Sequence, residues 1–384
     1  METATLAAGE SSRLHSMVQE RFYRPELDVL RFVAFLLVLL NHTWLVPEGS
    51  ALKLHIMRSL SHAGGCGVPL FFLLSAYLIT ELLLREKESK GDVNIGAFYV
   101  RRILRIWPLY FLMLFLVYGF GVAIPAFRIP LAEVAAYLLL AGNWYAVLHG
   151  LMISFGYPLW SICVEEQFYL VWPSLVRYAT RRNIAAVSLL LWLTCQVSVF
   201  ALSLRGVKIL PVMWPNSLVH LQYFALGALL SLALRGRVLR ISWIARAGLL
   251  ALGAFLFFAA DFFCGALTIS ARTGYLTMPG FLLVGAGAVS VFLGTIGASL
   301  PSLGKPFVYL GKISYGLYIY HALCLVVGDA FAGRVLHRHD HPALAVCAVA
   351  IPLTILISAA SYRFFETPFL KIKERFAVVH TRDI

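Results

Sequence analysis

The chain has 384 residues, of which 60% are hydrophobic and 13% are charged, and its mean hydropathy is +0.81. These values exclude an ordinary soluble domain, and apolar runs long enough to cross a bilayer as helices recur along the chain. The formal net charge of +13 does not indicate a nucleic-acid partner, because most basic residues fall in loops on one side of the predicted spans. We therefore expect an all-α, polytopic transmembrane helix bundle surrounded by lipid.

The apolar runs predict about ten spans with both termini in the cytoplasm. The spans lie at 27–46, 67–84, 103–123, 160–176, 184–204, 216–234, 241–260, 275–297, 313–331 and 343–364. If the eleventh apolar run, 131–147, does not cross, 24 of the 32 lysines and arginines lie inside. If it crosses, every later loop inverts and most of this bias disappears. We therefore predict that 131–147 is re-entrant or lies along the outer interface.

One transmembrane domain, 24–368, is expected between two short cytoplasmic tails, 1–23 and 369–384. The first 20 residues lack a basic start followed by an apolar core and a cleavage site, so no cleaved signal peptide is expected. The six cysteines form no CxxC pair and are predicted to be small buried side chains.

The first span, in RPELDVLRFVAFLLVLLNH, carries three ionisable groups. Asp28, Arg31 and His42 are separated by steps of three and four residues and fall on one helix face. Such groups usually face the bundle interior or a wet cavity. Two interpretations stay open: a structural Asp–Arg pair with a histidine bonded to a neighbouring helix, or a histidine that acts as a general base along a path through the membrane.

The sequence YVRRILRIWPLY places Arg101, Arg102 and Arg105 at the cytoplasmic end of the third span. Arg102 and Arg105 lie one helical turn apart, and two guanidinium groups on one face bind phosphate through paired hydrogen bonds. The alternative is that these arginines only follow the positive-inside rule.

The sequence LWSICVEEQFYLVWP places two adjacent carboxylates, Glu165 and Glu166, at a predicted span. Ser161 precedes Glu165 by one turn, and Tyr169 follows Glu166 by three residues. The acids are either solvated without a role, or they orient a histidine or accept a proton.

The ninth span, in KISYGLYIYH, presents Ser314, Tyr318 and His321 on one stripe, which fits either helix packing or a site. The sequence HRHDH at 337–341 is predicted to be an exposed loop rather than a metal site. Taken together, the clusters place phosphate-binding arginines at the inner mouth, and a histidine and acids towards the outer half. This arrangement suits a cytoplasmic phosphorylated donor and an acceptor reached from the other side.

These motifs, with GVPLFFLLSAYLIT between the first two and YRFFETP after the last, resemble acyltransferase family 3 in content and order, over roughly 24–368. The family consists of integral-membrane enzymes that transfer an acyl group, usually acetyl, from acyl-CoA to a hydroxyl group of glycans, lipid-linked sugars and some macrolides. The resemblance implies a bundle of about ten helices, acyl-CoA as donor substrate, and no permanently bound cofactor or metal. It also implies a multi-pass protein of the bacterial inner membrane.

The resemblance implies specific roles for the residues above. The expected catalytic residues are His42 as general base and Glu165 or Glu166. The donor would be bound by Arg102 and Arg105 of the RxxR motif, with Arg31 and Arg101. Supporting residues are expected to be Asp28, Ser75, Ser161, Tyr169, Tyr315, Tyr318 and His321. Departures from the family pattern, at Ala76, Cys163 and Gly316, affect helix spacing more than chemistry.

Two rival functions stay open: a transporter or flippase that moves a lipid-linked saccharide without group transfer, and a non-catalytic assembly or sensor protein in which His42 is dispensable. No inverted repeat supports the transporter. The acceptor, the acyl chain length and an acyl-histidine intermediate are also left open by the sequence.

Overall fold

The computed structural model describes residues 22–43, 51–152, 154–268, 270–299, 304–336 and 343–379. Ten long helices make up most of this described chain: α2 (Pro25–Thr43), α4 (Gly67–Lys90), α5 (Ile95–Ala123), α8 (Leu159–Tyr178), α9 (Arg181–Leu204), α10 (Ser217–Leu234), α11 (Trp243–Phe262), α12 (Thr277–Thr295), α14 (Ser314–Leu336) and α15 (Ala343–Ala360). The shorter helices are α3 (Leu52–His62), α6 (Leu131–Leu138), α7 (Gly142–His149), α13 (Lys305–Lys312) and α16 (Thr367–Glu374), with single turns at Ala63–Cys66, Pro125–Phe127, Ile209–Met213 and Ser361–Glu366. Within the described ranges, the β-structure is one isolated bridge between Lys208 and Arg272.

Each of the ten predicted spans coincides with one of the long helices, and the all-α bundle is confirmed. Eight of the ten lie in stretches of the described chain that are long and apolar enough to cross a membrane. The other two, α2 and α8, have 19 and 20 residues, which is sufficient length at 1.5 Å per residue, but each carries several charged residues. The number of spans and the side on which the termini lie stay predictions.

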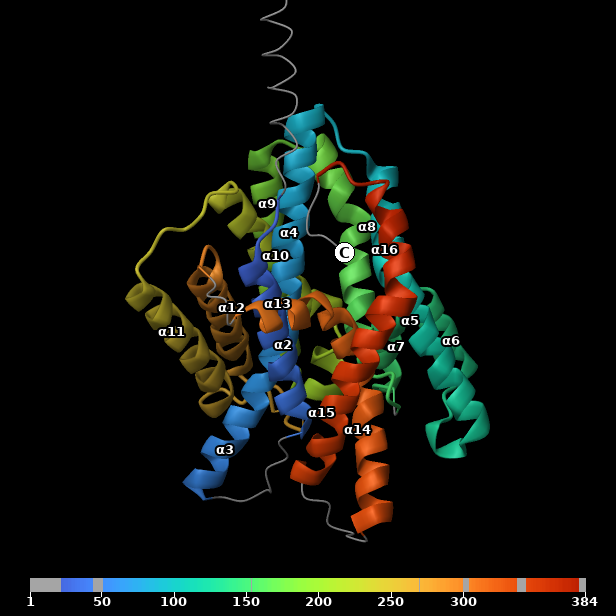
Figure 1. Ribbon diagram of the computed structural model, residues 1–384. Coiled ribbons are helices and arrows are strands. Elements are labelled where there is room, and N and C mark those ends of the chain that lie inside the picture. The colour runs from blue at the N-terminus through green and yellow to red at the C-terminus, as the bar shows by residue number, and fades with distance from the viewer. Residues whose placement is uncertain are drawn as a thin grey trace, which may run out of the picture.

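The predicted non-crossing segment 131–147 forms two helices separated by a turn. α6 and α7 have eight residues each, about 12 Å at 1.5 Å per residue, which is too short to cross a hydrocarbon core of about 30 Å. α6 packs beside α5 at one edge of the molecule (Figure 1). The predicted C-terminal tail begins inside α16, which also packs against α5. Most of the predicted N-terminal tail and the HRHDH sequence lie outside the described residues.

Five helices form a closed ring of contacts at the heart of the bundle. α4 contacts α2 and α8, α8 contacts α5, and α14 contacts both α5 and α2. The remaining five long helices pack outside this five-helix ring: α10 and α9 lie behind α4, α11 and α12 pair at the far edge, and α15 packs against α14 (Figure 1). In the most apolar part of Leu52–Lys90, 78% of residues are buried, against 22% for Trp243–Phe262. α4 therefore lies in the protein interior, and α11 faces outwards.

Small residues let the ring helices approach closely. A Cβ atom on Gly67, at the start of α4, would lie 2.2 Å from the carbonyl oxygen of Ala34 in α2. A Cβ atom on Gly227 of α10 would lie 2.2 Å from the carbonyl oxygen of Leu73 in α4. Close backbone packing at small residues is typical of membrane helices, which gain little from burying apolar side chains away from lipid.

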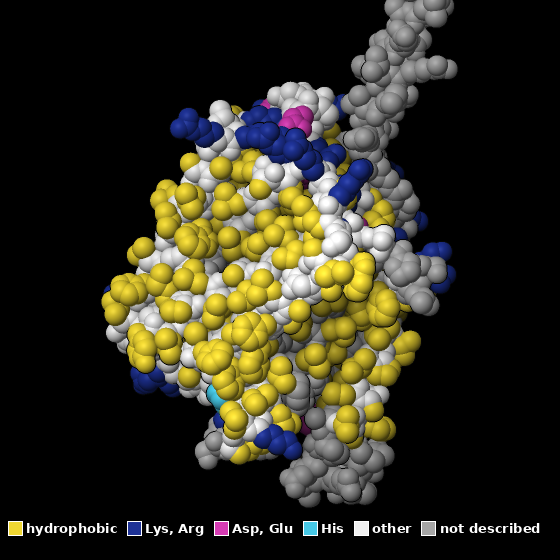
Figure 2. All heavy atoms as spheres, turned by 90° about the vertical axis from the view of Figure 1, so that its left-hand side faces the viewer, with side chains coloured by type: hydrophobic (Ala, Val, Ile, Leu, Met, Phe, Trp, Pro, Cys, Tyr) yellow, Lys and Arg dark blue, Asp and Glu magenta, His cyan; other side chains and the backbone are white. Residues whose placement is uncertain are grey.

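The surface divides into an apolar belt and a basic end. On the face in Figure 2, hydrophobic side chains cover the middle of the molecule, and Lys and Arg side chains gather at the upper end. This upper end is where α4 finishes, and the last turn of α4 carries Lys87 and Lys90 (Figure 1). The distribution is the one expected of a membrane protein whose basic end faces the cytoplasm.

Candidate functional site

Two cavities follow one another along the five-helix ring, and they are named for the predicted orientation; α3, Leu210, Trp214 and Leu267 add to the lining of the outer one. The inner cavity consists of two adjoining spaces of about 100 and 90 Å³, which share Arg31, Ser75, Arg102 and Arg105 in their lining. The outer cavity has a volume of about 430 Å³ and is lined by His42 among others. Val68 and Tyr318 line both cavities and form the wall between them.

Three of the four arginines predicted to bind a donor line the inner cavity. Arg31, on α2, pairs with Asp28 at 2.9 Å between Nη1 and Oδ1, so the predicted Asp–Arg pair exists. The Arg102 guanidinium lies over two aromatic rings, 5.7 Å from the centre of Phe98 and 5.8 Å from that of Tyr169. A planar cation stacked in this way keeps its edge available for bidentate bonds to an anion. Sequence reasoning did not single out two further cations of this lining, Arg24 and Lys373.

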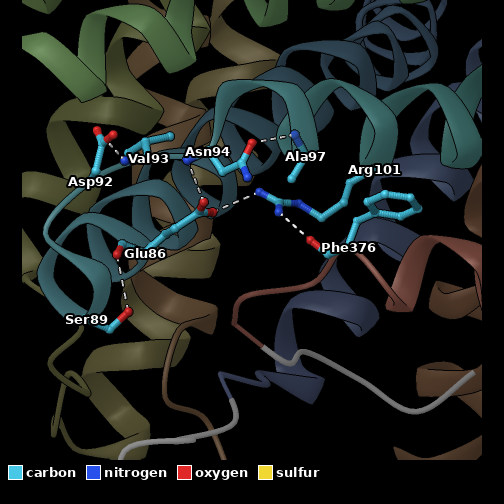
Figure 3. Close-up of polar contacts among 8 residues, drawn as sticks. All are labelled: Glu86, Ser89, Asp92, Val93, Asn94, Ala97, Arg101 and Phe376. Carbon is cyan, nitrogen blue, oxygen red and sulfur yellow. Dashed lines mark hydrogen bonds and ion pairs between the residues drawn. The ribbon is translucent and has the colours of Figure 1, made fainter.

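Arg101 has a different environment, which Figure 3 shows in close-up. Its Nη2 pairs with the buried Glu86 carboxylate at 2.9 Å, and its Nη1 donates to the backbone carbonyl of Phe376 at 2.7 Å. The other oxygen of Glu86 accepts the Asn94 backbone N–H at the start of α5 (2.9 Å). Arg101 is absent from the residues that line the inner cavity, and it joins α4, α5 and the segment after α16. Arg101 instead lines a small neighbouring cavity of about 50 Å³ with Arg102 and Lys373, to which Arg31 and Arg105 do not contribute.

Of the two adjacent glutamates, Glu165 lines the inner cavity. Its carboxylate hydrogen-bonds the hydroxyls of Ser75 and Tyr169, which also hydrogen-bond each other. All three side chains belong to the cavity lining and join α4 to α8. Glu166 faces α5 instead, where its Oε2 accepts the indole N–H of Trp107 at 3.0 Å. The Oε1 atom of Glu166 is buried and has no partner among the described residues.

The polar stripe on α14 passes along both cavities. Ser314 and Tyr315 line the inner cavity, and the Tyr315 hydroxyl donates to the backbone carbonyl of Ile106 in α5 at 2.8 Å. The Tyr318 and Ser161 hydroxyls are 2.7 Å apart, at the wall between the cavities. One helix face therefore links the arginines at one end to the histidine site at the other.

His42 meets His321 where the α2 and α14 stripes converge. The His42 Nδ1 and His321 Nε2 atoms are 3.2 Å apart, and the rings stack with centroids 5.2 Å apart. Tyr157 packs edge-on against His42, with ring centroids 5.0 Å apart, and its hydroxyl lies 3.4 Å from His321 Nε2. The sequence had suggested that a glutamate might orient His42, but its partner is an imidazole, and Glu165 lies across the wall in the inner cavity.

The hydrogen bonds assign the protons on the two neutral imidazoles. His321 Nδ1 lies 2.6 Å from the backbone carbonyl of Tyr318 and must donate to it, since a carbonyl only accepts. His321 Nε2 is then an acceptor, so His42 Nδ1 carries a proton and donates to it. This leaves a lone pair on His42 Nε2, and that is the form in which a histidine acts as a base.

A second histidine of the outer cavity was missed by sequence reasoning. His62, the last residue of α3, lies within hydrogen-bond distance of Asp261 of α11, and the two residues belong to segments far apart in the chain. Asp261 could have indicated this pair from the sequence, because it is the only acid in the apolar run of α11, and an acid within a span usually has a polar partner.

Comparisons with known proteins agree with the motifs. A family model described as an acyltransferase domain matches residues 24–363. The chain is similar to a peptidoglycan O-acetyltransferase of Listeria monocytogenes, with 26% identity over 377 residues, covering 91% of this chain and 56% of the relative. A putative peptidoglycan O-acetyltransferase of Bacillus subtilis is 26% identical over 376 residues, covering 92% of this chain and 56% of the relative.

A putative O-acetyltransferase of Staphylococcus aureus (strain MSSA476) is also 26% identical, over 380 residues that cover 91% of this chain and 58% of the relative. The chain thus spans little more than half the length of these curated relatives. No solved structure matches it.

Proposed function

Since the chain belongs to acyltransferase family 3, we propose that it is a membrane O-acyltransferase that moves an acetyl group from cytoplasmic acetyl-CoA to a hydroxyl group of a glycan. The observation that carries this proposal is the placement of His42. Its Nε2 lone pair is held available by His321 in an outer cavity, and a cavity lined by arginines adjoins on the predicted cytoplasmic side.

The inner cavity is proposed to hold the donor. Arg31, Arg102 and Arg105 gather positive charge in a partly buried space, where charge-assisted bonds to phosphate are strong. From Arg31 to His42 is 11 residues along α2, or about 16 Å at 1.5 Å per residue. The extended pantetheine arm of a coenzyme A thioester is of this order of length. The thioester would then reach the wall at Tyr318 while the phosphates stay with the arginines.

The proposed reaction is a direct transfer with His42 as the base. His42 Nε2 takes the proton of the acceptor hydroxyl, and the oxygen attacks the thioester carbonyl. The C–S bond then breaks, and the imidazolium returns the proton to the thiolate, so an ester and free coenzyme A are formed. A positioned general base contributes about 10²–10⁴-fold to the rate of such a step.

The remaining polar residues are proposed to hold these groups in place. Asp28 fixes Arg31, and the hydroxyls of Ser75 and Tyr169 fix Glu165 beside the donor. Ser161, Tyr315 and Tyr318 position α14 against α8 and α5, and thereby His321 against His42.

A glycan acceptor and a bacterial plasma membrane are proposed from the relatives. Two of them are named for peptidoglycan, whose sugar hydroxyls lie outside the cytoplasm. A cytoplasmic donor and an outer acceptor require both termini inside, as the charge distribution predicts.

The test uses the chain in membrane vesicles with acetyl-CoA labelled in the acetyl group and a peptidoglycan glycan strand as acceptor. Wild type is expected to move label to the glycan and release coenzyme A, and His42→Ala at equal abundance is expected to do neither. His55→Ala, on α3 and outside both cavities, serves as the matched control. A wild type that binds the glycan without consuming acetyl-CoA would support the flippase, and an active His42→Ala would remove His42 from the mechanism.

A further inference from the structure

The outer cavity holds a second imidazole that the proposed reaction does not use. His62 Nδ1 lies 2.9 Å from Asp261 Oδ2. The Asp261 side chain is 3% exposed, whereas that of His62 is 24% exposed and lines the outer cavity. The buried partner is therefore the acid, and the imidazole is the member of the pair that a ligand can reach.

The Asp261 carboxylate is fixed by bonds on both oxygens. Besides the His62 contact, its Oδ1 accepts the Leu267 backbone N–H at 3.2 Å and the Thr268 hydroxyl at 3.0 Å. An ionised carboxylate only accepts, so His62 Nδ1 must carry a proton and donate to it. The ring orientation is fixed, and Nε2 is left as the free polar atom. Nε2 accepts from a hydroxyl when the ring is neutral and donates to its oxygen when the ring is charged.

His62 and His42 lie on neighbouring segments of one cavity. The Asn41 side-chain amide donates to the backbone carbonyl of Ser61 at 3.3 Å, so the residues preceding both histidines are in contact. His42 lies towards the donor, because its partner His321 is bonded to Tyr318 of the shared wall. His62 lies on α3, outside the five-helix ring, and its partner is on α11. The two imidazoles therefore contact a molecule bound in the outer cavity from different sides.

The rest of the lining suits a sugar. The volume of about 430 Å³ lies within the range of about 300–1,000 Å³ that is typical of small-molecule sites, which combine aromatic walls with a few placed polar groups. Trp160 and Trp214 line this cavity with their ring centroids 6.4 Å apart, and Trp214, the more exposed of the two, offers an apolar surface for the C–H face of a pyranose.

We propose that His62, held by Asp261, binds a second hydroxyl group of the acceptor sugar, next to the hydroxyl that reacts at His42. His62 is then a substrate-binding residue that decides which hydroxyl of the ring is presented to the base. This inference rests on the proposed function and adds the requirement that the acceptor carry two neighbouring polar substituents.

The test compares His62→Ala with His55→Ala. His55 is also on α3 and also contacts α11, since its Nε2 lies 3.2 Å from the backbone carbonyl of Phe262, but it lines neither cavity. Two rates are measured for each variant: acetyl transfer to a β-1,4-linked N-acetylglucosamine tetrasaccharide, and hydrolysis of acetyl-CoA without acceptor. His62→Ala is expected to raise the acceptor KM about tenfold, the loss of one hydrogen bond, with hydrolysis of acetyl-CoA unchanged. The thermal midpoint is expected to fall, because the buried Asp261 carboxylate loses its partner. Asp261→Asn is expected to give a smaller rise in KM.

Monodeoxy acceptors separate binding from structure. In wild type, removal of one hydroxyl other than the reacting one is expected to raise KM about tenfold, and in His62→Ala the same removal is expected to have no further effect. The proposal would be overturned if His62→Ala lowered acetyl transfer and acetyl-CoA hydrolysis equally, or if the deoxy sugar and the variant raised KM additively. His62 would then be a structural residue. If wild type transfers no acetyl group, the proposed function fails, and tryptophan fluorescence titration with the tetrasaccharide still decides whether His62→Ala weakens binding tenfold.

Discussion

Replacement of His321 by phenylalanine tests whether the neighbouring imidazole sets the proton position on His42. Phenylalanine keeps an aromatic ring against Phe35, whose ring centroid is 6.1 Å from that of His321, and removes both ring nitrogens. The lost bond to His42 Nδ1, 3.2 Å long, is worth about 0.5–1.5 kcal/mol. This free energy changes the ratio of the Nδ1-protonated to the Nε2-protonated form of His42 by about 2–13-fold.

We therefore expect kcat to fall by up to about tenfold in His321→Phe, and by the larger factor of about 10²–10⁴ in His42→Ala. The assay is release of coenzyme A at saturating acetyl-CoA and glycan. His321→Gln is the paired variant, because its amide oxygen still accepts a hydrogen bond, and it is expected to recover part of the rate. An unchanged kcat in His321→Phe would refute the tautomer argument. A loss as large as that of His42→Ala, with an unchanged thermal midpoint, would instead make His321 the base.

Three further predictions concern the inner cavity. Arg102→Ala and Arg105→Ala are each expected to raise KM for acetyl-CoA about tenfold or more, because a charge-assisted phosphate bond is lost, and steady-state kinetics with varied donor measures this. Arg101→Ala is expected to lower the thermal midpoint, because the buried Glu86 carboxylate loses its cation, and to leave KM for acetyl-CoA unchanged. Differential scanning calorimetry of detergent-solubilised protein measures the midpoint. A changed KM with an unchanged midpoint would contradict this prediction. Glu165→Gln is expected to lower kcat/KM at least tenfold while Glu166→Gln stays within about threefold, and the reverse order would show that the wrong glutamate has been assigned to the donor.

Periodicity predicted which residues of a helix act together, because that depends on one helix alone. Asp28, Arg31 and His42 were placed on one face of the first span, and in the structure all three face the ring interior, with Arg31 and His42 lining its two cavities. The same holds for Ser314 and Tyr318 of α14. The fold class followed from apolar runs for the same reason, since a span in lipid must satisfy its own backbone.

Contacts between residues on different helices could not be predicted from the sequence. His42 and His321 are 279 positions apart, and His62 and Asp261 are 199 apart, so no local pattern connects them. The choice between Glu165 and Glu166 depends on how α8 is rotated against α4, because adjacent residues on a helix point about 100° apart. Arg101 belongs to the same cluster of arginines in the sequence as Arg102 and Arg105, and only the structure shows that it pairs with Glu86 instead of lining the inner cavity.

The wall between the two cavities also bears on the tightness of the membrane to ions. Two polar cavities that extend towards each other from opposite faces of a membrane allow protons to leak across it if water connects them. In this protein the separation is reduced to Val68 and Tyr318, with the Phe71 ring edge-on to Tyr318 at a centroid distance of 5.7 Å. Under the proposed function, with a cytoplasmic donor and an outer acceptor, this layer has to stay closed between turnovers, and Val68 and Tyr318 would then limit proton leakage as well as separate the two substrates.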